Sequence, residues 1–271
     1  MHKCLFYLVL IFVGFLAACN HDDTPYGDNQ ATGRFYRIRG MEMYCEVYGQ
    51  GKPLLMIHGN GGSISAFSRN IGYFAQKYQV IVADSRAQGH SADLRDSISF
   101  EQMADDYADL LDSLHAAPAN VLGWSDGGII ALLMTIRHPQ KVSKLVASGA
   151  NLWPDSTAIK PSEWLEEQKE YLKMKDAQHM TIGQKNRWKM LLLDMEQPHI
   201  SLNQLHTIKC PAFVVCGEFD LIRREHTQLI YNNLLHANLW VIPHEDHYTI
   251  SEHVRDFNYR VDEFFAKPFH E

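Results

Sequence analysis

The chain has 271 residues and a formal net charge of −7, from 25 Lys and Arg against 32 Asp and Glu. Hydrophobic residues make up 46% of the sequence and charged residues 21%, which is typical of a folded globular protein and excludes a disordered chain. The acidic balance, without any run rich in Lys and Arg, argues against a nucleic-acid binder. No uninterrupted apolar run reaches the roughly 18 residues of a membrane-spanning helix.

Residues 1–18 have the composition of a secretory signal peptide. Lys3 supplies a positive start, residues 5–16 form an apolar run, and small residues precede Cys19. The tetrapeptide Leu-Ala-Ala-Cys at this point resembles the lipobox of bacterial lipoproteins, which implies that Cys19 becomes the lipidated first residue of the mature chain. We therefore expect an exported protein, anchored by lipid to a bacterial cell-envelope membrane, with residues 19–34 as a flexible tether. An ordinary buried helix is the alternative for the apolar run.

The other cysteines do not form a disulfide framework. With Cys4 in the signal peptide and Cys19 in the lipobox, an odd set of three remains, Cys45, Cys210 and Cys216. Cys210 and Cys216 lie six residues apart in one predicted strand, which holds them too far apart to bond. We expect these three residues to be buried free thiols.

From residue 35 onward, predicted strands and helices alternate. Two short strands around Gly40 predict a hairpin. Short apolar runs predict buried strands, and longer segments with helical spacing predict the helices between them. The predicted strands cover residues 53–57, 80–83, 120–124, 145–148, 212–216 and 239–242, and the predicted helices cover residues 64–78, 100–114, 129–137, 225–235 and 257–265.

This alternation predicts an α/β fold, with a mainly parallel sheet covered by helices on both faces. Residues 152–204 break the rhythm, because they contain no strand-like run and carry aromatic residues in helical segments. We expect them to form a small helical cap, inserted before the last two strands. Such a cap lies over the C-terminal edge of the sheet, where ligands bind in folds of this kind.

The segment Gly-Trp-Ser-Asp-Gly around Ser125 has the Gly-x-Ser-x-Gly pattern, between a predicted strand and a predicted helix. A serine hydroxyl becomes a good nucleophile when a histidine, oriented by a carboxylate, removes its proton. In this architecture the acid follows the serine in the chain and the histidine comes last. The last two predicted strands are followed by the candidate acids Glu218 and Asp220 and by the candidate bases His244 and His247.

From about residue 35 to about residue 265 the sequence resembles the α/β-hydrolase family, which implies one domain over residues 35–271. The Gly-x-x-Asp after the penultimate strand matches the acid of the family and selects Asp220. The histidine that precedes a glutamate by five residues resembles the terminal histidine motif and selects His247. The sequence from Asp84 to Ser91 resembles the Asp-x-Arg-Gly-x-Gly-x-Ser loop of the family, with Ala87 in place of the usual glycine.

The resemblance also implies an oxyanion hole made by two backbone N–H groups. One belongs to Asp126, directly after the serine, and the other to Asn60 in a His-Gly-Asn segment, with Gly61 as the alternative. We expect the Asp126 side chain to point away along the start of its helix, where an acid is favourable. Haloalkane dehalogenases share the fold and the His-Gly-Asn segment but use an aspartate nucleophile, so Ser125 disfavours dehalogenation and epoxide opening.

The sequence therefore predicts a serine hydrolase that cleaves a small, largely apolar carboxylic ester through an acyl-enzyme on Ser125. The choice of an ester is an analogy with the commonest reaction of this fold. Hydrolysis of a C–C or amide bond by the same triad is one alternative, and a ligand receptor without turnover is another. We expect no cofactor and no metal, because the histidines share no ligand spacing. The sequence does not indicate an oligomeric state.

The cap is expected to set the specificity. Its apolar and aromatic residues recur at roughly helical spacing, and most of them are expected to pack the cap onto the body. Trp153 and Trp188 are expected to line the pocket and to select an apolar acyl or aromatic group. The charged residues between the apolar positions are expected to be solvated: Glu163, Glu166, Glu167, Lys169 and Lys173.

Overall fold

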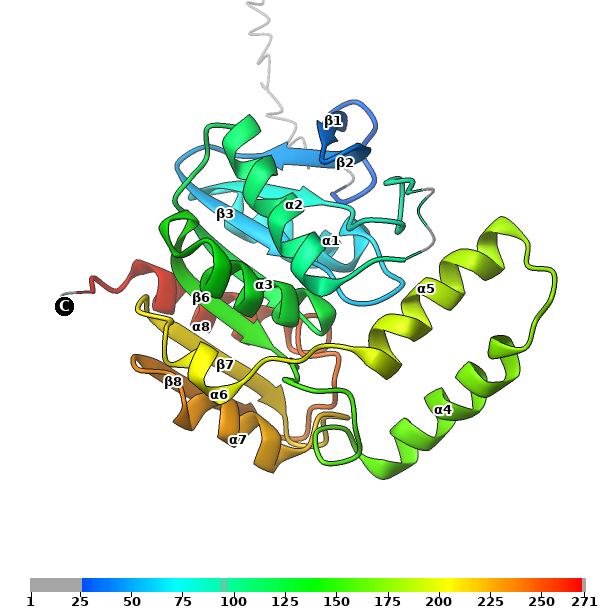
Figure 1. Cartoon of the computed structure of the whole chain (residues 1–271). Helices are drawn as coiled ribbons and strands as arrows, with labels where there is room; N and C mark the ends of the chain where they lie inside the picture. Colours follow the sequence, from blue (N-terminus) through cyan, green and yellow to red (C-terminus); the bar gives the residue numbers. More distant parts are fainter. Residues whose placement is uncertain (1–25, 94, 96, 270–271) are drawn as a thin grey trace, which may run out of the picture.

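The computed structural model describes residues 26–93, 95 and 97–269 (Figure 1). The predicted signal peptide, Cys19 and the first part of the predicted tether lie outside the described residues. None of the helices in the described part of the chain combines the length and the apolarity that a membrane span requires.

An eight-stranded sheet forms the centre of the structure, in the order β1-β2-β4-β3-β5-β6-β7-β8. The β1–β2 and β2–β4 pairs are antiparallel, and every other pair is parallel. The mainly parallel sheet that the sequence predicts is therefore confirmed. The strands are β1 (Arg34–Ile38), β2 (Met41–Tyr48), β3 (Lys52–Ile57), β4 (Tyr78–Ala83), β5 (Ala119–Trp124), β6 (Val142–Ser148), β7 (Ala212–Gly217) and β8 (Ala237–Ile242).

Helices cover both faces of this sheet and bury a separate apolar core on each (Figure 1). Because successive strand residues point to opposite faces, Leu55 and Ile57 of β3 join one core while Leu54 and Met56 join the other. The first core lies under α2 (Phe100–Ser113), α3 (Asp126–Arg137) and α7 (Arg224–Asn232), and the second under α1 (Ser68–Phe74) and α8 (Val254–Ala266).

The helix predicted over residues 64–78 is shorter in the structure. A 3₁₀ turn, Ile64–Phe67, precedes α1, and α1 ends at Phe74. Tyr78 already belongs to β4, where it is buried in the second core. The apolar spacing of this segment thus continues across a helix and the start of a strand, so periodicity alone misplaced the end of the helix.

Two helices, α4 (Pro161–Lys175) and α5 (Ile182–Glu196), form the cap between β6 and β7 and stand apart from the rest of the molecule (Figure 1). A short helix, α6 (Leu202–Leu205), leads back to the sheet. No residue of α4 is buried, whereas the second half of α5 buries Met190, Leu191 and Leu193. The cap is therefore attached to the body mainly through the second half of α5.

The second half of the predicted 19–34 tether is packed against the sheet. The buried carboxylate of Glu46 accepts hydrogen bonds from the N–H groups of Gly27 (3.2 Å) and Asn29 (2.6 Å). It also accepts one from the hydroxyl of Tyr48. A polar composition suggested a tether here, but the backbone donors of this segment bind one buried acid of β2, so the predicted boundary at residue 34 is too late.

The loop after β4 is organised by two buried charged side chains. Asp84 accepts hydrogen bonds from the N–H groups of Ile64 (2.8 Å) and His90 (2.7 Å). Arg86 is fully buried and pairs with Asp106. Within this loop Ala87 has a φ of 62°, a left-handed conformation that strains any residue with a Cβ atom. The glycine usual at this position of the resembled motif is thus the residue that the backbone favours.

Replacing Ala87 with glycine is expected to raise the free energy of unfolding by about 0.5–1 kcal/mol. The relief of left-handed strain, about 1–2 kcal/mol, exceeds the added chain entropy of the unfolded state. Urea unfolding measures the change. The control is Ala104→Gly in the regular helix α2, which is expected to lower stability by about 1 kcal/mol. A loss in Ala87→Gly equal to that of the control contradicts the assignment of strain.

Candidate active site

Ser125 occupies a tight turn between β5 and α3. Its φ of 56° and ψ of −124° lie outside the regions that a residue with a Cβ atom ordinarily adopts. A Cβ atom on Gly123 would lie 1.9 Å from the carbonyl oxygen of Gly127, and one on Gly127 would lie 1.9 Å from that of Ile57. Only glycine therefore fits on either side of the serine. The Ser125 N–H donates to the carbonyl of Ser148 (2.8 Å), which fixes the turn to β6.

A histidine and an aspartate complete a hydrogen-bonded chain with this serine. Nε2 of His247 lies 2.9 Å from Oγ of Ser125, and Nδ1 of His247 lies 2.7 Å from Oδ1 of Asp220. Asp220, which is 2% exposed, also accepts hydrogen bonds from the N–H groups of Gly217 and Ile222. With Nδ1–H donating to this carboxylate, Nε2 is left to accept the proton of the serine hydroxyl.

The alternative acid and base lie elsewhere. The side chain of His244 is 87% exposed, and its ring nitrogen lies 3.6 Å from a carboxylate oxygen of Glu218. The backbone N–H of His244 donates to the same carboxylate (2.9 Å). The structure thus pairs these two residues with each other at the surface and brings His247 and Asp220 to Ser125.

The loop after β3 passes directly beside the serine. A Cβ atom on Gly59 would lie 2.9 Å from Cβ of Ser125. His58 is buried and fixes the start of the loop, because its Nδ1–H donates to the carbonyl of Gly59 (2.8 Å) while its Nε2 accepts from the N–H of Ser85 (2.9 Å). Burial lowers the pKa of His58, so the ring is neutral. Asn60, the candidate oxyanion donor, follows in this loop.

The second candidate donor is the N–H of Asp126. Asp126 is the first residue of α3, where backbone N–H groups have no acceptor within the helix. The positive end of the helix dipole reinforces any negative charge that forms there. The Asn60 N–H thus comes from the loop after β3 and the Asp126 N–H from the start of α3, both at the C-terminal ends of parallel strands.

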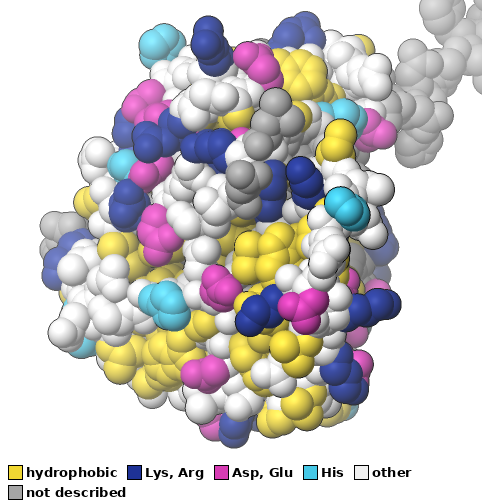
Figure 2. Space-filling model, turned by 45° about the vertical axis from the view of Figure 1, so that its right-hand side comes forward, with side chains coloured by type: hydrophobic (Ala, Val, Ile, Leu, Met, Phe, Trp, Pro, Cys, Tyr) yellow, Lys and Arg dark blue, Asp and Glu magenta, His cyan; other side chains and the backbone are white. Residues whose placement is uncertain are grey.

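A pocket of about 270 Å³ opens over Ser125. Its walls come from the loops after the parallel strands and from the cap. The apolar and aromatic lining consists of Phe100, Trp124, Ile129, Ile159, Leu221, Ile222 and Tyr248, and the polar lining includes Asn60, Asp126, Asn151, Glu167, Arg187, Asp194 and Gln197. On the side of the molecule where α4 and α5 lie, acidic, basic and hydrophobic side chains are interspersed (Figure 2).

Three expectations about this pocket are wrong. The Asp126 side chain does not point away from the site but is buried in the pocket wall, and Glu167, expected to be solvated, lines the same pocket. Neither Trp153 nor Trp188 is among the lining residues. Trp188 stacks on Tyr171, with 5.1 Å between ring centroids, so it packs α5 against α4. Helical spacing did not show which face of each cap helix turns toward the serine.

Three carboxyl groups give the pocket an acidic character. Burial raises the pKa of Asp126 to about 7, and the nearby Glu167 adds to the rise. Burial, followed by the charges of Asp126 and Glu167, raises the pKa of Asp194. Burial also raises the pKa of Glu167. Arg187 is the basic residue of the lining, but its guanidinium already pairs with Glu170 outside the pocket (2.5 and 2.9 Å).

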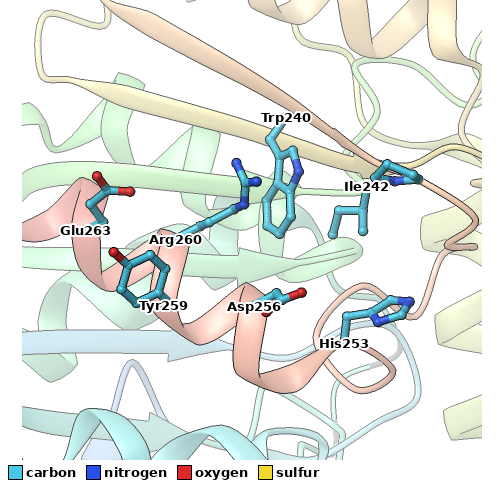
Figure 3. Close-up of a pocket in the computed structure, with 8 residues that line it drawn as sticks. Trp240, Ile242, His253, Asp256, Tyr259, Arg260 and Glu263 are labelled. Atoms are coloured by element: carbon cyan, nitrogen blue, oxygen red, sulfur yellow. The ribbon is translucent and has the colours of Figure 1, made fainter.

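A larger hollow of about 470 Å³ lies between β8 and α8 (Figure 3). The guanidinium of Arg260 lies 4.6 Å from the ring centroid of Trp240 and occupies part of it. None of the residues that line this hollow belongs to the chain of hydrogen bonds at Ser125. The pocket over Ser125 is therefore the candidate active site, although the hollow between β8 and α8 is larger.

Within the described residues, no group of three or more His, Cys, Asp or Glu is arranged to hold a metal ion. Cys45, Cys210 and Cys216 are free thiols. Burial raises the pKa of both Cys210 and Cys216 to about 11, so neither is a thiolate at neutral pH.

Comparisons with known proteins agree with this architecture. A family model described as the alpha/beta hydrolase fold matches residues 52–174. The human protein "Serine hydrolase BPHL" is 28% identical over 244 residues, which are 84% of each chain. A "Pimeloyl-[acyl-carrier protein] methyl ester esterase" from Chromobacterium violaceum is 37% identical over 119 residues, or 43% of this chain and 45% of that one.

Solved structures share the fold at lower identity. A hydrolase from Pseudomonas aeruginosa superposes with a TM-score of 0.74 at 18% identity, covering 88% of this chain and all of that one. The enol-lactonase from Burkholderia xenovorans gives a TM-score of 0.70 at 17% identity, with 86% and 100% covered. The chain therefore has the α/β-hydrolase fold and is an enzyme, and the predicted fold is confirmed.

The sequence analysis did not find the acidic wall of the pocket, which Asp126, Glu167 and Asp194 form. Asp194 is a single charge inside the apolar run of residues 190–195, and an isolated acid in such a run indicates a buried polar role. Asp126 was considered only for its backbone. Glu167 lies among other charged residues of α4, and nothing in the sequence distinguishes it from them.

The buried carboxyl of Asp126 is expected to make stability depend on pH. Its folded pKa of about 7 lies above the ordinary 3.8, so the folded protein binds the proton more tightly, and this group lowers the free energy of unfolding as pH rises from about 4 to about 7. Asp126→Asn removes this loss. Urea unfolding between pH 4 and 8 is expected to show the variant gaining stability over the wild type as pH rises. The exposed Glu166→Gln serves as control. A difference that does not change with pH contradicts the raised pKa.

Proposed function

We propose that this α/β-hydrolase-fold enzyme is a serine hydrolase that cleaves carboxylic esters through an acyl-enzyme on Ser125. The observation that carries the proposal is the hydrogen-bonded chain from Ser125 through His247 to Asp220, set at a pocket. Relatives whose names include a serine hydrolase and a methyl ester esterase support it. No feature of the pocket favours amide or C–C bond cleavage over ester cleavage.

The proposed reaction has two halves. Oγ of Ser125 attacks the ester carbonyl while Nε2 of His247 takes the hydroxyl proton, and Asp220 stabilises the imidazolium. The backbone N–H groups of Asn60 and Asp126 stabilise the oxyanion, with Gly61 as the alternative to Asn60. His247 then returns the proton to the leaving alcohol. In the second half a water molecule, deprotonated by the same imidazole, releases the acid and restores the serine.

We revise the expected substrate from an apolar ester to one that carries an ammonium group, because the pocket has an acidic wall. Asp126 is 6% exposed, and its Oδ2 atom has no hydrogen-bond partner within the described part of the chain. The same holds for Oε2 of Glu167. Buried carboxylate oxygens without donors are costly, and a bound ammonium group supplies both hydrogen bonds and the opposite charge. We therefore assign an ester with an amine near its carbonyl and a small apolar remainder.

The proposal for the N-terminus is export and attachment to the cell envelope through lipid on Cys19. It rests on the sequence of residues 1–19 alone. The contacts of Gly27 and Asn29 with Glu46 support a short connection between such an anchor and the folded body. The substrate pocket is then carried close to a membrane surface.

Removing either Ser125 or His247 is expected to abolish most turnover. Ser125→Ala and His247→Ala are each expected to lower kcat for p-nitrophenyl acetate by about a thousandfold or more, and the double variant to be scarcely worse, because the two groups act as a unit. The matched histidine control, His244→Ala, is expected to retain its rate. An inactive His244→Ala beside an active His247→Ala shows that the base is wrongly assigned.

The amine preference is tested with two p-nitrophenyl esters of equal shape, those of alanine and of isobutyric acid. At pH 7 the wild type is expected to favour the alanine ester in kcat/KM, and Asp126→Asn to reduce this preference about tenfold, as befits the loss of one charged hydrogen bond. Glu166→Gln, a surface change on α4, is the charge control. A wild-type preference for isobutyrate, unaltered in Asp126→Asn, contradicts an ammonium subsite.

The anchor is tested by Cys19→Ala. This variant is expected to leave the membrane fraction or to accumulate unprocessed, with unchanged ester turnover, because the cysteine lies outside the catalytic domain. Stable attachment requires more than one acyl chain, which mass spectrometry of the mature N-terminus detects. An unmodified mature N-terminus at any other residue removes the lipid-anchor proposal.

A further inference from the structure

The side chain of Asn60 joins the candidate oxyanion loop to the cap. Its Nδ2 donates to Oδ1 of Asp194 (2.9 Å) and to the backbone carbonyl of Met190 (3.3 Å). Both acceptors belong to α5 and are one turn apart, so one amide group bridges two successive turns of the helix. Asn60 itself lies 130 residues earlier in the chain.

The body contacts the loop on both sides of Asn60, because the N–H of Ile64, four residues later, donates to Asp84. Both ring nitrogens of His58 are bonded, and Gly59 lies against Ser125. Directly after Asn60, Gly61 adopts a φ of 63°, and a Cβ atom there would meet no atom within 4 Å. The N–H of Gly62 donates to the carbonyl of Gly59 (3.3 Å), and between these fixed points the contacts of the Asn60 side chain with α5 add a further restraint on the Asn60 peptide.

The second half of α5 is packed against the body and bonded to it. Met190, Leu191 and Leu193 are buried, and the Lys189 ammonium donates to the carbonyl of Asp93 (2.9 Å). Just beyond the helix, the Gln197 side chain binds the backbone at both Ile98 and Phe100. The first half of α5 and all of α4 lack this attachment. Asp194 thus lies on the part of the cap that is packed against and bonded to the body.

We propose that Asp194 is a positioning residue, which holds the Asn60 side chain and thereby aims the Asn60 N–H at the oxyanion. This inference rests on the proposed serine hydrolase function. The catalytic body supplies the nucleophile, and the cap completes the oxyanion hole. A cap packed differently against the body then loses transition-state stabilisation even while the substrate is bound.

The carboxyl group of Asp194 lines the same pocket as Asp126 and Glu167, so a change at this position also affects how a cationic substrate binds. A neutral ester separates the two effects, because it does not respond to the charge of the wall. With p-nitrophenyl acetate, a change in kcat between variants therefore reports on the position of the N–H and not on the charge of the wall. Asn at position 194 keeps an oxygen acceptor for Asn60 without the charge.

The experiment measures kcat and KM for p-nitrophenyl acetate in Asn60→Ala, Asp194→Ala, their double variant and Asp194→Asn. Removing an oxyanion donor outright costs about a hundredfold or more, so misdirecting one is expected to lower kcat about tenfold in each single variant, with KM within about twofold. The double variant is expected to be no slower than the slower single variant, because both changes break one contact. Asp194→Asn is expected to restore most of the kcat lost in Asp194→Ala.

Glu196→Ala is the matched control, since it removes an exposed carboxylate at the end of the same helix. Thermal unfolding of every variant shows that the fold is retained. Wild-type kcat in Asn60→Ala, losses that multiply in the double variant, or an effect on KM alone overturns the proposal. A wild-type protein that does not hydrolyse the ester overturns the proposed function itself, and this inference falls with it.

Discussion

The groups of the active site are arranged around the strained turn at Ser125. A serine with a φ of 56° persists only where its surroundings hold it, and here β5, β6 and α3 all contribute. Gly123 and Gly127 allow the backbone segments to approach closely, and their contacts leave no room for a Cβ atom. The turn directs Oγ toward His247 and sets the first N–H of α3 beside it. Nucleophile and anion-stabilising dipole thus come from one backbone conformation.

The parallel sheet brings the remaining catalytic groups together at one of its edges. Asn60, Ser125, Asp220 and His247 each follow the C-terminal end of a different strand, and these ends meet at one edge. Hydrogen bonds inside the loops, such as those that Asp220 accepts from its own turn, fix each side chain before substrate arrives. Preorganisation of this kind is the main source of catalysis in the proposed mechanism.

The sequence predicts features that are marked by residues close together in the chain better than features that depend on contacts between distant residues. The strands and the turn at Ser125 leave local marks in the sequence, so apolar runs and glycine positions were enough to find them, although contacts with β3 and β6 hold the turn. The pairing of His247 with Asp220 rather than of His244 with Glu218 came from a family resemblance, and the geometry agrees with it. The limit of the N-terminal tether was missed, because Glu46 acts on it from another strand.

The cap was harder to predict from the sequence for the same reason. Periodicity indicated its helices, but the faces that they turn toward the pocket depend on contacts across more than a hundred residues, such as that of Asn60 with Asp194. Trp188 was expected in the pocket and instead packs α5 on α4, while Glu167 faces the pocket from an exposed helix. Hydrophobicity alone therefore suggested an apolar site where buried carboxyls give it an acidic wall.

Covalent labelling tests whether Ser125 is the nucleophile. The protein is treated with a fluorophosphonate until ester turnover is lost, then digested and analysed by mass spectrometry. We expect one phosphonyl group per chain, on the peptide that contains Ser125, in proportion to the activity lost. Loss of turnover with Ser125 unmodified, or full modification of Ser125 with turnover unchanged, would contradict it.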